Sequence, residues 1–412
     1  MKIKSKWKKR YMIYGIFVFL CLVLNLIAWN STTFCDWYIK FIFPVWVNTY
    51  GRLMNLFSFS VGEIMLFLAV GLAVVFILLT PMAVGYQLLD FRRRRKVREA
   101  AYAAEVVCAE LPGGATEIVS EKTPGMFRRF CKYYMIFFAW LVLIVCVIMT
   151  LNCTILYHAS TFSEKYFGEA RDQYTFEELV KVRNLVVEKC NELSEQMVRD
   201  EEGYILYDGD IRRDSVAAMQ QLGETYDQLD GYYPYPKPLA TSDFFSQQYM
   251  CGYYFPFSME ANYNGVMYIM NMHSTLCHEL AHLRGYIFED EANFISYLAC
   301  IQSEEPVVQY SGYLSVLNYL DNDYYKAVGK DWEAYISQPQ ILEQVHDDNI
   351  FLTEEEWDRI EDKAVLDTET VDEVSDAFTE TTLKINGVSD GMISYSRVVK
   401  LLLQYYEAQG LF

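Results

Sequence analysis

Two histidines four residues apart, with a glutamate directly after the first, are the residues of this sequence best suited to chemistry. His278 and His282 frame the segment His-Glu-Leu-Ala-His. In a helix, side chains four residues apart lie on the same face, so both imidazoles can bind one divalent ion. Glu279 then lies beside that ion, where a carboxylate can take a proton from an attacking water. This HExxH pattern predicts two zinc ligands and a general base.

A catalytic zinc site needs a third protein ligand and leaves one position for water. Glu289 is the predicted third ligand, because a turn at Gly285 lets the chain return to the histidines and a second helix can begin near Glu289. Asn293 then lies one turn along on the same face and would hold a ligand in place. If the second helix starts later or turns differently, Glu291 faces the site, so Glu291 is the alternate ligand.

The elements that must position these residues are two helices and the turn between them. Ser274 or Thr275 can cap the start of the histidine helix, and Gly285 can end it in the left-handed conformation. Three leucines in this segment, spaced four and three residues apart, predict an apolar stripe on the helix face away from the histidines. These leucines are Leu276, Leu280 and Leu283.

Other residues near this segment are candidates for supporting roles. His273, Tyr310 and Tyr313 are near enough in sequence to stabilise an oxyanion. Taken alone, each of them is interpreted as a packing residue in preference to an oxyanion donor. Cys277 projects to a different side of the helix from His278, which predicts a buried thiol and not a ligand.

The histidine segment followed by Glu-x-x-Ala-Asn resembles the gluzincin group of metallopeptidases. In that group the first glutamate of this motif is a zinc ligand, which implies the same role for Glu289. The longer stretch from Gly252 through Asn293, behind three hydrophobic spans, resembles an uncharacterised family of bacterial membrane proteins with an HExxH motif. The first resemblance implies a zinc peptidase, whereas the second implies no substrate.

Composition limits the kind of protein this is. Hydrophobic residues make up 52% of the 412 residues, and the net charge is −19. No large basic face remains once the lysines and arginines beside the spans are set aside, which excludes nucleic acid as a partner. Ten cysteines are scattered without a CxxC pair, so neither a zinc ribbon nor a dense disulfide framework is expected.

Three uncharged runs are long enough to cross a lipid bilayer about 30 Å thick. They cover residues 11–29, 64–89 and 133–157. Lysines and arginines precede the first run and follow the second, where Arg92 to Lys96 is a continuous basic stretch. Residues 30–62 are rich in aromatics and poor in charge, as expected of chain at the membrane interface or partly re-entering.

The basic stretch predicts how the chain crosses the membrane. By the positive-inside rule the N-terminus and the loop 90–132 are cytoplasmic, and residues 158–412 are extracellular. We therefore expect a membrane region, residues 1–157, in a multi-pass cell-membrane protein. Residues 158–412 are the expected extracytoplasmic metallopeptidase-like domain.

The outer domain has mainly helical patterns, so the predicted fold class is mainly α. Residues 176–198 and 213–229 have helical periodicity, and residues 395–406 can form a final helix. Residues 248–270 mix aromatics, glycines and alternating stretches, which predicts a short β element beside the histidine helix. The acidic run 353–382 contains no calcium-loop pattern and is interpreted as solvated helix faces.

These patterns together predict a membrane-anchored zinc peptidase with one Zn²⁺, the lipid bilayer as a partner, and peptide or protein substrates at the cell surface. One alternative is a non-catalytic sensor or scaffold in which zinc is structural. Another is a metal-dependent hydrolase of envelope polymers, because HExxH does not specify the bond that is cleaved.

Overall fold

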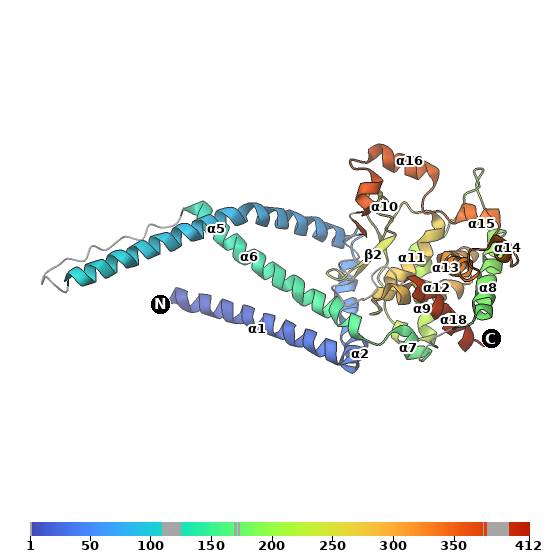
Figure 1. Cartoon of the computed structure of the whole chain (residues 1–412), viewed down its shortest axis with the longest axis horizontal. Coiled ribbons are helices and arrows are strands. Elements are labelled where there is room, and N and C mark those ends of the chain that lie inside the picture. Colours follow the sequence, from blue (N-terminus) through green and yellow to red (C-terminus); the bar gives the residue numbers. More distant parts are fainter. Residues whose placement is uncertain (1, 109–124, 169–170, 172–173, 374, 377–394) are drawn as a thin grey trace. The chain divides into compact units, whose positions relative to one another are not determined.

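The computed structural model describes residues 2–108, 125–168, 171, 174–373, 375–376 and 395–412. As predicted, the chain is mainly α-helical with one small sheet (Figure 1). It divides into two compact units. The first contains Met1–Leu20 and Ile64–Val147, and the second contains Cys21–Glu63 and Ile148–Phe412. The predicted boundary at residue 158 differs from this division, because the chain between the first two spans belongs to the unit that carries HExxH.

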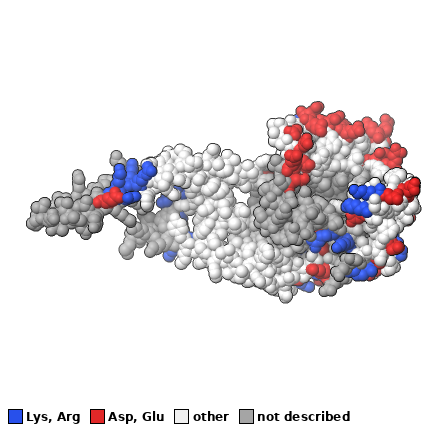
Figure 2. All heavy atoms as spheres, in the orientation of Figure 1, with Lys and Arg blue, Asp and Glu red and all other residues white. Residues whose placement is uncertain are grey.

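Three helices are long and apolar enough to cross a membrane, as predicted. The candidate spans are Lys9–Asn30, Val61–Arg93 and Met126–His158. They lie on the helices α1 (Lys2–Asn30), α5 (Val61–Cys108) and α6 (Met126–Met149) with the turns that follow α6. In the face shown in Figure 2, basic residues gather near the far end of α5, where Arg92, Arg93, Arg95 and Lys96 are exposed. Residues 90–108 of the predicted loop are helical, and residues 109–124 lie outside the described residues.

Aromatic contacts hold the helices of the first unit together. The rings of Phe76 and Phe138 stack with their centroids 4.0 Å apart, and the Tyr134 hydroxyl donates to the Leu72 carbonyl at 2.6 Å. Tyr14 contacts Trp140 edge to face at 5.2 Å. Each of the three helices therefore contributes at least one ring to this unit.

The second unit is built mostly of short and medium helices around α11 and α12 (Figure 1). Its described α-helices are α2 (Thr32–Phe41), α3 (Phe43–Trp46), α4 (Arg52–Met54), α7 (Phe162–Tyr166), α8 (Phe176–Ser194), α9 (Ile211–Thr225), α10 (Ser242–Ser246), α11 (Ile269–His282), α12 (Glu289–Ile301), α13 (Pro306–Ala327), α14 (Trp332–Tyr335), α15 (Glu343–Asp348), α16 (Glu354–Lys363) and α18 (Tyr395–Ala408). Short π or 3₁₀ turns are η1 (Val47–Gly51), η2 (Thr150–Thr154), η3 (Leu156–His158) and η4 (Asp227–Leu229).

The helices predicted from periodicity are present. α8 begins at the predicted residue because Thr175 and Glu178 form a reciprocal capping box. The second predicted helix is α9 followed by the 3₁₀ turn η4, and the final one is α18. α16 carries acidic residues on its exposed surface (Figure 2), as predicted for the described part of the acidic run. Residues 374 and 377–382 of that run lie outside the described residues.

The predicted β element is a three-stranded sheet in the order β1-β3-β2. β1 (Lys237–Pro238) pairs parallel to β3 (Glu260–Tyr263), and β2 (Gly252–Phe255) pairs antiparallel to β3. Gly252 lies opposite Tyr263, and Phe255 lies opposite Glu260. β2 is therefore an edge strand of this sheet.

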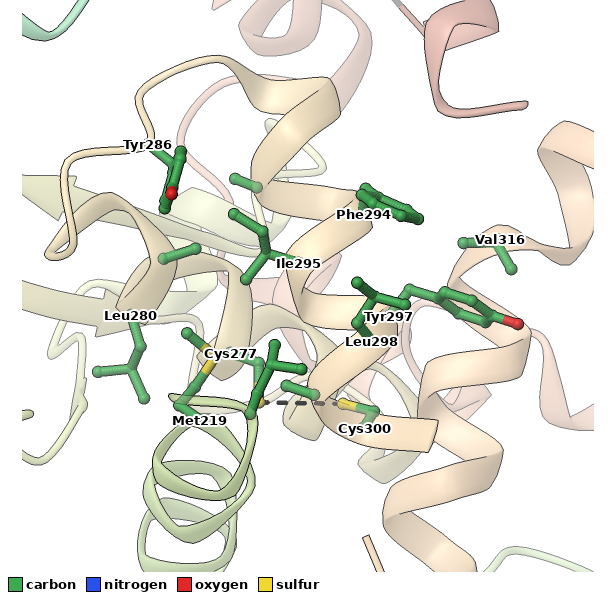
Figure 3. Close-up of a cluster of buried hydrophobic side chains, with 14 of the residues drawn as sticks. Met219, Cys277, Leu280, Tyr286, Phe294, Ile295, Tyr297, Leu298, Cys300 and Val316 are labelled. Carbon is green, nitrogen blue, oxygen red and sulfur yellow. Dashed lines mark hydrogen bonds between the residues drawn. The ribbon is translucent and has the colours of Figure 1, made fainter. Parts of the chain in front are cut away.

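α11 and α12 form the centre of the hydrophobic core (Figure 3). The three predicted stripe leucines of the histidine helix are completely buried. Cys277 is also buried, as predicted, and its sulfur lies 3.9 Å from that of Cys300 on α12 as a free thiol pair. Because the apolar side of α11 is fixed in this way, its other side is free to present the histidines.

The segment between the first two spans is part of the same core. Ile39 on α2, Phe43 on α3 and Val47 in η1 are almost fully buried among side chains of the HExxH unit. Asp36 accepts hydrogen bonds from the backbone and hydroxyl of Ser160 at 2.9 and 2.7 Å. Residues 31–60 therefore form a structural layer of this unit.

Candidate metal centre

The histidines lie on the last turn and a half of α11, and the chain then reverses into α12. Gly285 has a φ of +92°, the left-handed conformation predicted for the turn. α12 begins at Glu289, also as predicted. The predicted cap at Ser274 or Thr275 is wrong, because α11 already begins at Ile269. Its additional residues are largely apolar and buried, so burial and not a polar cap fixes the start of the helix.

Three potential ligand atoms converge at the turn between α11 and α12. The Nε2 atoms of His278 and His282 lie 3.1 Å apart. Glu289 places one carboxylate oxygen 3.0 Å from His278 Nε2 and the other 3.8 Å from His282 Nε2. In the described part of the chain, this is the one group of three such side chains whose ligand atoms all lie within 4.8 Å of one another.

Hydrogen bonds at the far side of each ring fix the tautomers. Nδ1 of His278 lies 2.8 Å from the amide oxygen of Asn293, and Nδ1 of His282 lies 2.7 Å from the carbonyl oxygen of Tyr286. Both oxygens only accept hydrogen bonds, so both Nδ1 atoms carry the proton. Burial lowers the pKa of His278, but Glu289 raises it to about 9, so without a metal ion the His278 Nε2 also carries a proton, which faces Glu289. A metal cation at this position would replace that proton and accept a lone pair from each Nε2.

This arrangement fits a zinc ion. Two tetrahedral ligand nitrogens at a Zn–N distance of about 2.0–2.1 Å are about 3.3–3.4 Å apart, close to the observed separation. Two imidazole nitrogens and a carboxylate that face each other repel unless a proton or a metal cation lies between them. Glu289 is 44% exposed, so the cluster is open to solvent on one side. Two histidines, one glutamate and an open side are typical of catalytic zinc sites.

Glu279 is buried next to the cluster and holds an unused acceptor. Its Oε2 has no hydrogen-bond partner among the described residues. Burial raises the pKa of Glu279 to about 8, while the His278 charge lowers it and the Glu289 charge raises it. A divalent cation nearby would favour the ionised form, which is the form that can accept a proton.

The alternate ligand Glu291 points to another part of the core. Its carboxylate accepts hydrogen bonds from the hydroxyl and the backbone N–H of Ser163 at 2.7 and 3.2 Å. Two residues along a helix correspond to a rotation of about 200°, so Glu289 and Glu291 face nearly opposite directions. Glu289 is thus the residue that the structure brings to the histidines.

The three oxyanion candidates lie elsewhere in the core. Tyr310 donates its hydroxyl hydrogen to Asp348 at 2.8 Å, and Tyr313 contacts the ring of Tyr297 edge to face. His273 is fully buried against Tyr207, and its ring nitrogens have no hydrogen-bond partner among the described residues. Each contacts a part of the core outside the His278, His282 and Glu289 cluster, so packing accounts for all three.

Sequence reasoning missed three residues that shape the site. A Cβ on Gly252 would lie 2.9 Å from Glu279 Oε1 and 2.6 Å from the Asn262 carbonyl oxygen, so only glycine fits there. The ring of Tyr254 lies 6.0 Å from that of His282, and the Tyr286 carbonyl orients the same histidine. Gly252 and Tyr254 belong to the aromatic stretch that predicts the β element, but no pattern in that stretch specifies contact with the site.

A comparison with protein families identifies this chain. A family described as "Protein of unknown function (DUF3810)" matches residues 115–403, which is more than half of the chain. The chain belongs to this family. No curated protein and no solved structure matches it. Membership in DUF3810 agrees with the resemblance to an uncharacterised family, and the description assigns no chemistry to the cluster.

Proposed function

We propose that this DUF3810 protein is a zinc-dependent peptidase anchored in a membrane. The observation that carries the proposal is the convergence of His278 Nε2, His282 Nε2 and the Glu289 carboxylate beside a buried glutamate with an unused oxygen. The described cluster has three ligand groups and one exposed side. It therefore supports an open, catalytic site better than a closed, structural one.

The chain's own residues suffice for hydrolysis of an amide bond once the ion is in place. When bound, zinc supplies Lewis-acid polarisation of a carbonyl group and a lowered pKa of water. Glu279 accepts the proton of the water whose oxygen bonds to the carbonyl carbon. It then passes that proton to the nitrogen as the C–N bond breaks. Asn293 and the Tyr286 carbonyl keep the two imidazoles in the orientation that binds the ion.

The side of the membrane and the substrate are parts of the same proposal. Arg92, Arg93, Arg95 and Lys96 directly follow the second span, so the positive-inside rule favours a cytoplasmic position for that end. The HExxH unit then faces the extracytoplasmic side, where peptides or proteins at the cell surface would be its substrates. A structural zinc in a scaffold remains the alternative if metal analysis finds a fourth protein ligand and no water position.

The test compares the full-length protein with Glu279→Gln after reconstitution in lipid nanodiscs. We expect Glu279→Gln to keep stoichiometric zinc, since Glu279 is not a ligand, and to hydrolyse a broad peptide library about 10²–10⁴-fold more slowly. Glu355→Gln on the exposed face of α16 is the matched control and should keep full activity. Unchanged hydrolysis by Glu279→Gln would refute the peptidase assignment, as would wild-type hydrolysis that survives zinc removal by a chelator.

A further inference from the structure

Residues 31–60 expose an apolar surface on the HExxH unit. They contain three charged residues, Asp36, Lys40 and Arg52. Large apolar side chains are exposed along the whole segment; they are Trp37, Phe41, Val45, Trp46, Leu53, Leu56, Phe57 and Phe59. The segment begins directly after one candidate span and ends directly before the next. Lipid is therefore the occupant of this surface, because the chain enters and leaves it from a bilayer.

The same segment lies directly under the turn that holds the metal cluster. A Cβ on Gly285 would lie 2.8 Å from Ile39 on α2, so the turn between α11 and α12 rests on that helix. Ile39 is buried, whereas Trp37 and Phe41 on the same helix are exposed. An α-helix with its side chains is about 10–12 Å thick. One helix thus separates the metal-binding turn from the lipid-facing surface.

β2 connects the cluster to the ends of two spans over a short distance. At its start, Gly252 lies against Glu279. At its end, Phe255 contacts Gly62, which is the second residue of the span Val61–Arg93. The next residue, Pro256, accepts a hydrogen bond from Asn152 in the last part of the span Met126–His158. Three steps of about 3.3 Å along a strand give about 10 Å from the residue that contacts the general base to the start of one candidate span and the last part of the other.

An edge strand of this kind can pair with an extended peptide. A substrate lying beside β2, with its scissile bond at the cluster, reaches the bilayer surface after about three residues. We infer that the substrates are membrane-anchored polypeptides, cleaved within a few residues of the end of their membrane anchor. This inference rests on the proposed peptidase function and specifies its substrate class.

The experiment measures where cleavage occurs relative to a membrane anchor. The anchored probe is an apolar helix of about 20 residues followed by a randomised segment of about 24 residues, which extends up to about 80 Å. The soluble probe is the same randomised segment without the helix. Both are incubated with the zinc-loaded full-length protein in liposomes, and the cut positions are mapped by mass spectrometry. Glu279→Gln is the blank for both probes.

We expect cuts in the anchored probe within about eight residues of the helix, and cleavage of the soluble probe at least about tenfold slower. Anchoring by itself raises local concentration at all positions, so clustering near the helix is the specific result. Evenly distributed cuts, or equal cleavage of both probes, would overturn the inference and leave the peptidase function standing. If neither probe is cut, the proposed function itself fails.

Discussion

At the scale of single residues, the hydrogen bonds behind the histidines decide what the cluster can bind. Asn293 and the Tyr286 carbonyl each accept from an Nδ1 atom, so the two Nε2 atoms face one another and Glu289. A proton or a metal cation must compensate this arrangement of acceptors. Because the ring orientations are already set, a divalent ion would bind without further ordering of the side chains.

Removal of one such bond should weaken metal binding. Asn293→Ala leaves His278 free to rotate and to change tautomer, so we expect zinc affinity to fall about 10–100-fold. Asn293→Asp is the matched variant, because its carboxylate still accepts from Nδ1 and should keep affinity near that of the wild type. Competition with a zinc-binding dye measures the zinc affinity of both variants. Equal affinity of Asn293→Ala and the wild type would show that Asn293 does not support the site.

Substituting Glu289 and Glu291 separately should show which of them is the third metal ligand. Glu289→Ala removes one of three ligand groups and should abolish stoichiometric zinc. Glu291→Ala should keep zinc but lower the free energy of unfolding by about 1–3 kcal/mol, because the buried Ser163 hydroxyl and N–H lose their acceptor. Elemental analysis and thermal unfolding of the two proteins check this. Zinc loss in Glu291→Ala with retention in Glu289→Ala would reverse the assignment.

The sequence predicted the members of the cluster because their spacing is a property of helices and of one turn. His278 and His282 share a face at any i, i+4 spacing, and Gly285 favours the reversal before Glu289. Gly252 and the Tyr286 carbonyl approach the site through tertiary packing, which no local period encodes. Every residue type has a backbone carbonyl, so the sequence does not indicate which carbonyl will accept a hydrogen bond from a histidine. The three oxyanion candidates are near the histidines in sequence, but nearness in sequence is a poor measure of distance in a folded helical unit.

At the scale of elements, the turn between α11 and α12 depends on both its backbone and its support. Gly285 has a positive φ, and Ile39 on α2 fills the space where a side chain would stand. The turn is therefore held by glycine conformation on one side and by packing on the other. The start of α11 was mispredicted for a related reason, since burial of Met270 and Met272 extends the helix beyond its polar candidates for capping.

Gly285→Ala should disturb the turn between α11 and α12. A left-handed conformation costs a non-glycine residue about 1–2 kcal/mol, and the new methyl group must also displace Ile39. We expect a loss of at least this much unfolding free energy, together with weaker zinc binding. Gly51→Ala is the control, because Gly51 is helical and a Cβ there meets no atom closer than 3.5 Å. Equal thermal stability of the two variants would contradict the role of the turn.

At the scale of the whole molecule, the end of the third span is not the boundary between the two compact units. The hydrophobic runs and flanking charges predicted the spans, because a span is encoded by continuous composition. Composition did not predict that residues 21–63 join the HExxH unit. Their exposed aromatics indicate an interface segment, but their buried side chains contact partners more than a hundred residues away. Only the folded arrangement reveals such contacts.

A fragment of residues 158–412 should therefore fail to fold alone. It lacks core side chains that each contribute about 1.5–3 kcal/mol when buried; these include Ile39, Phe43, Val47, Ile155 and Leu156. Their combined loss is comparable to the total stability of a domain, about 5–15 kcal/mol. We expect the fragment to lack a cooperative thermal transition and to bind zinc at least about tenfold more weakly than the full chain, because the turn over α2 loses its support. Co-expression with residues 1–157 as a separate chain should restore both properties, whereas cooperative unfolding and unchanged zinc affinity of the isolated fragment would show that residues 31–60 are not needed for this fold.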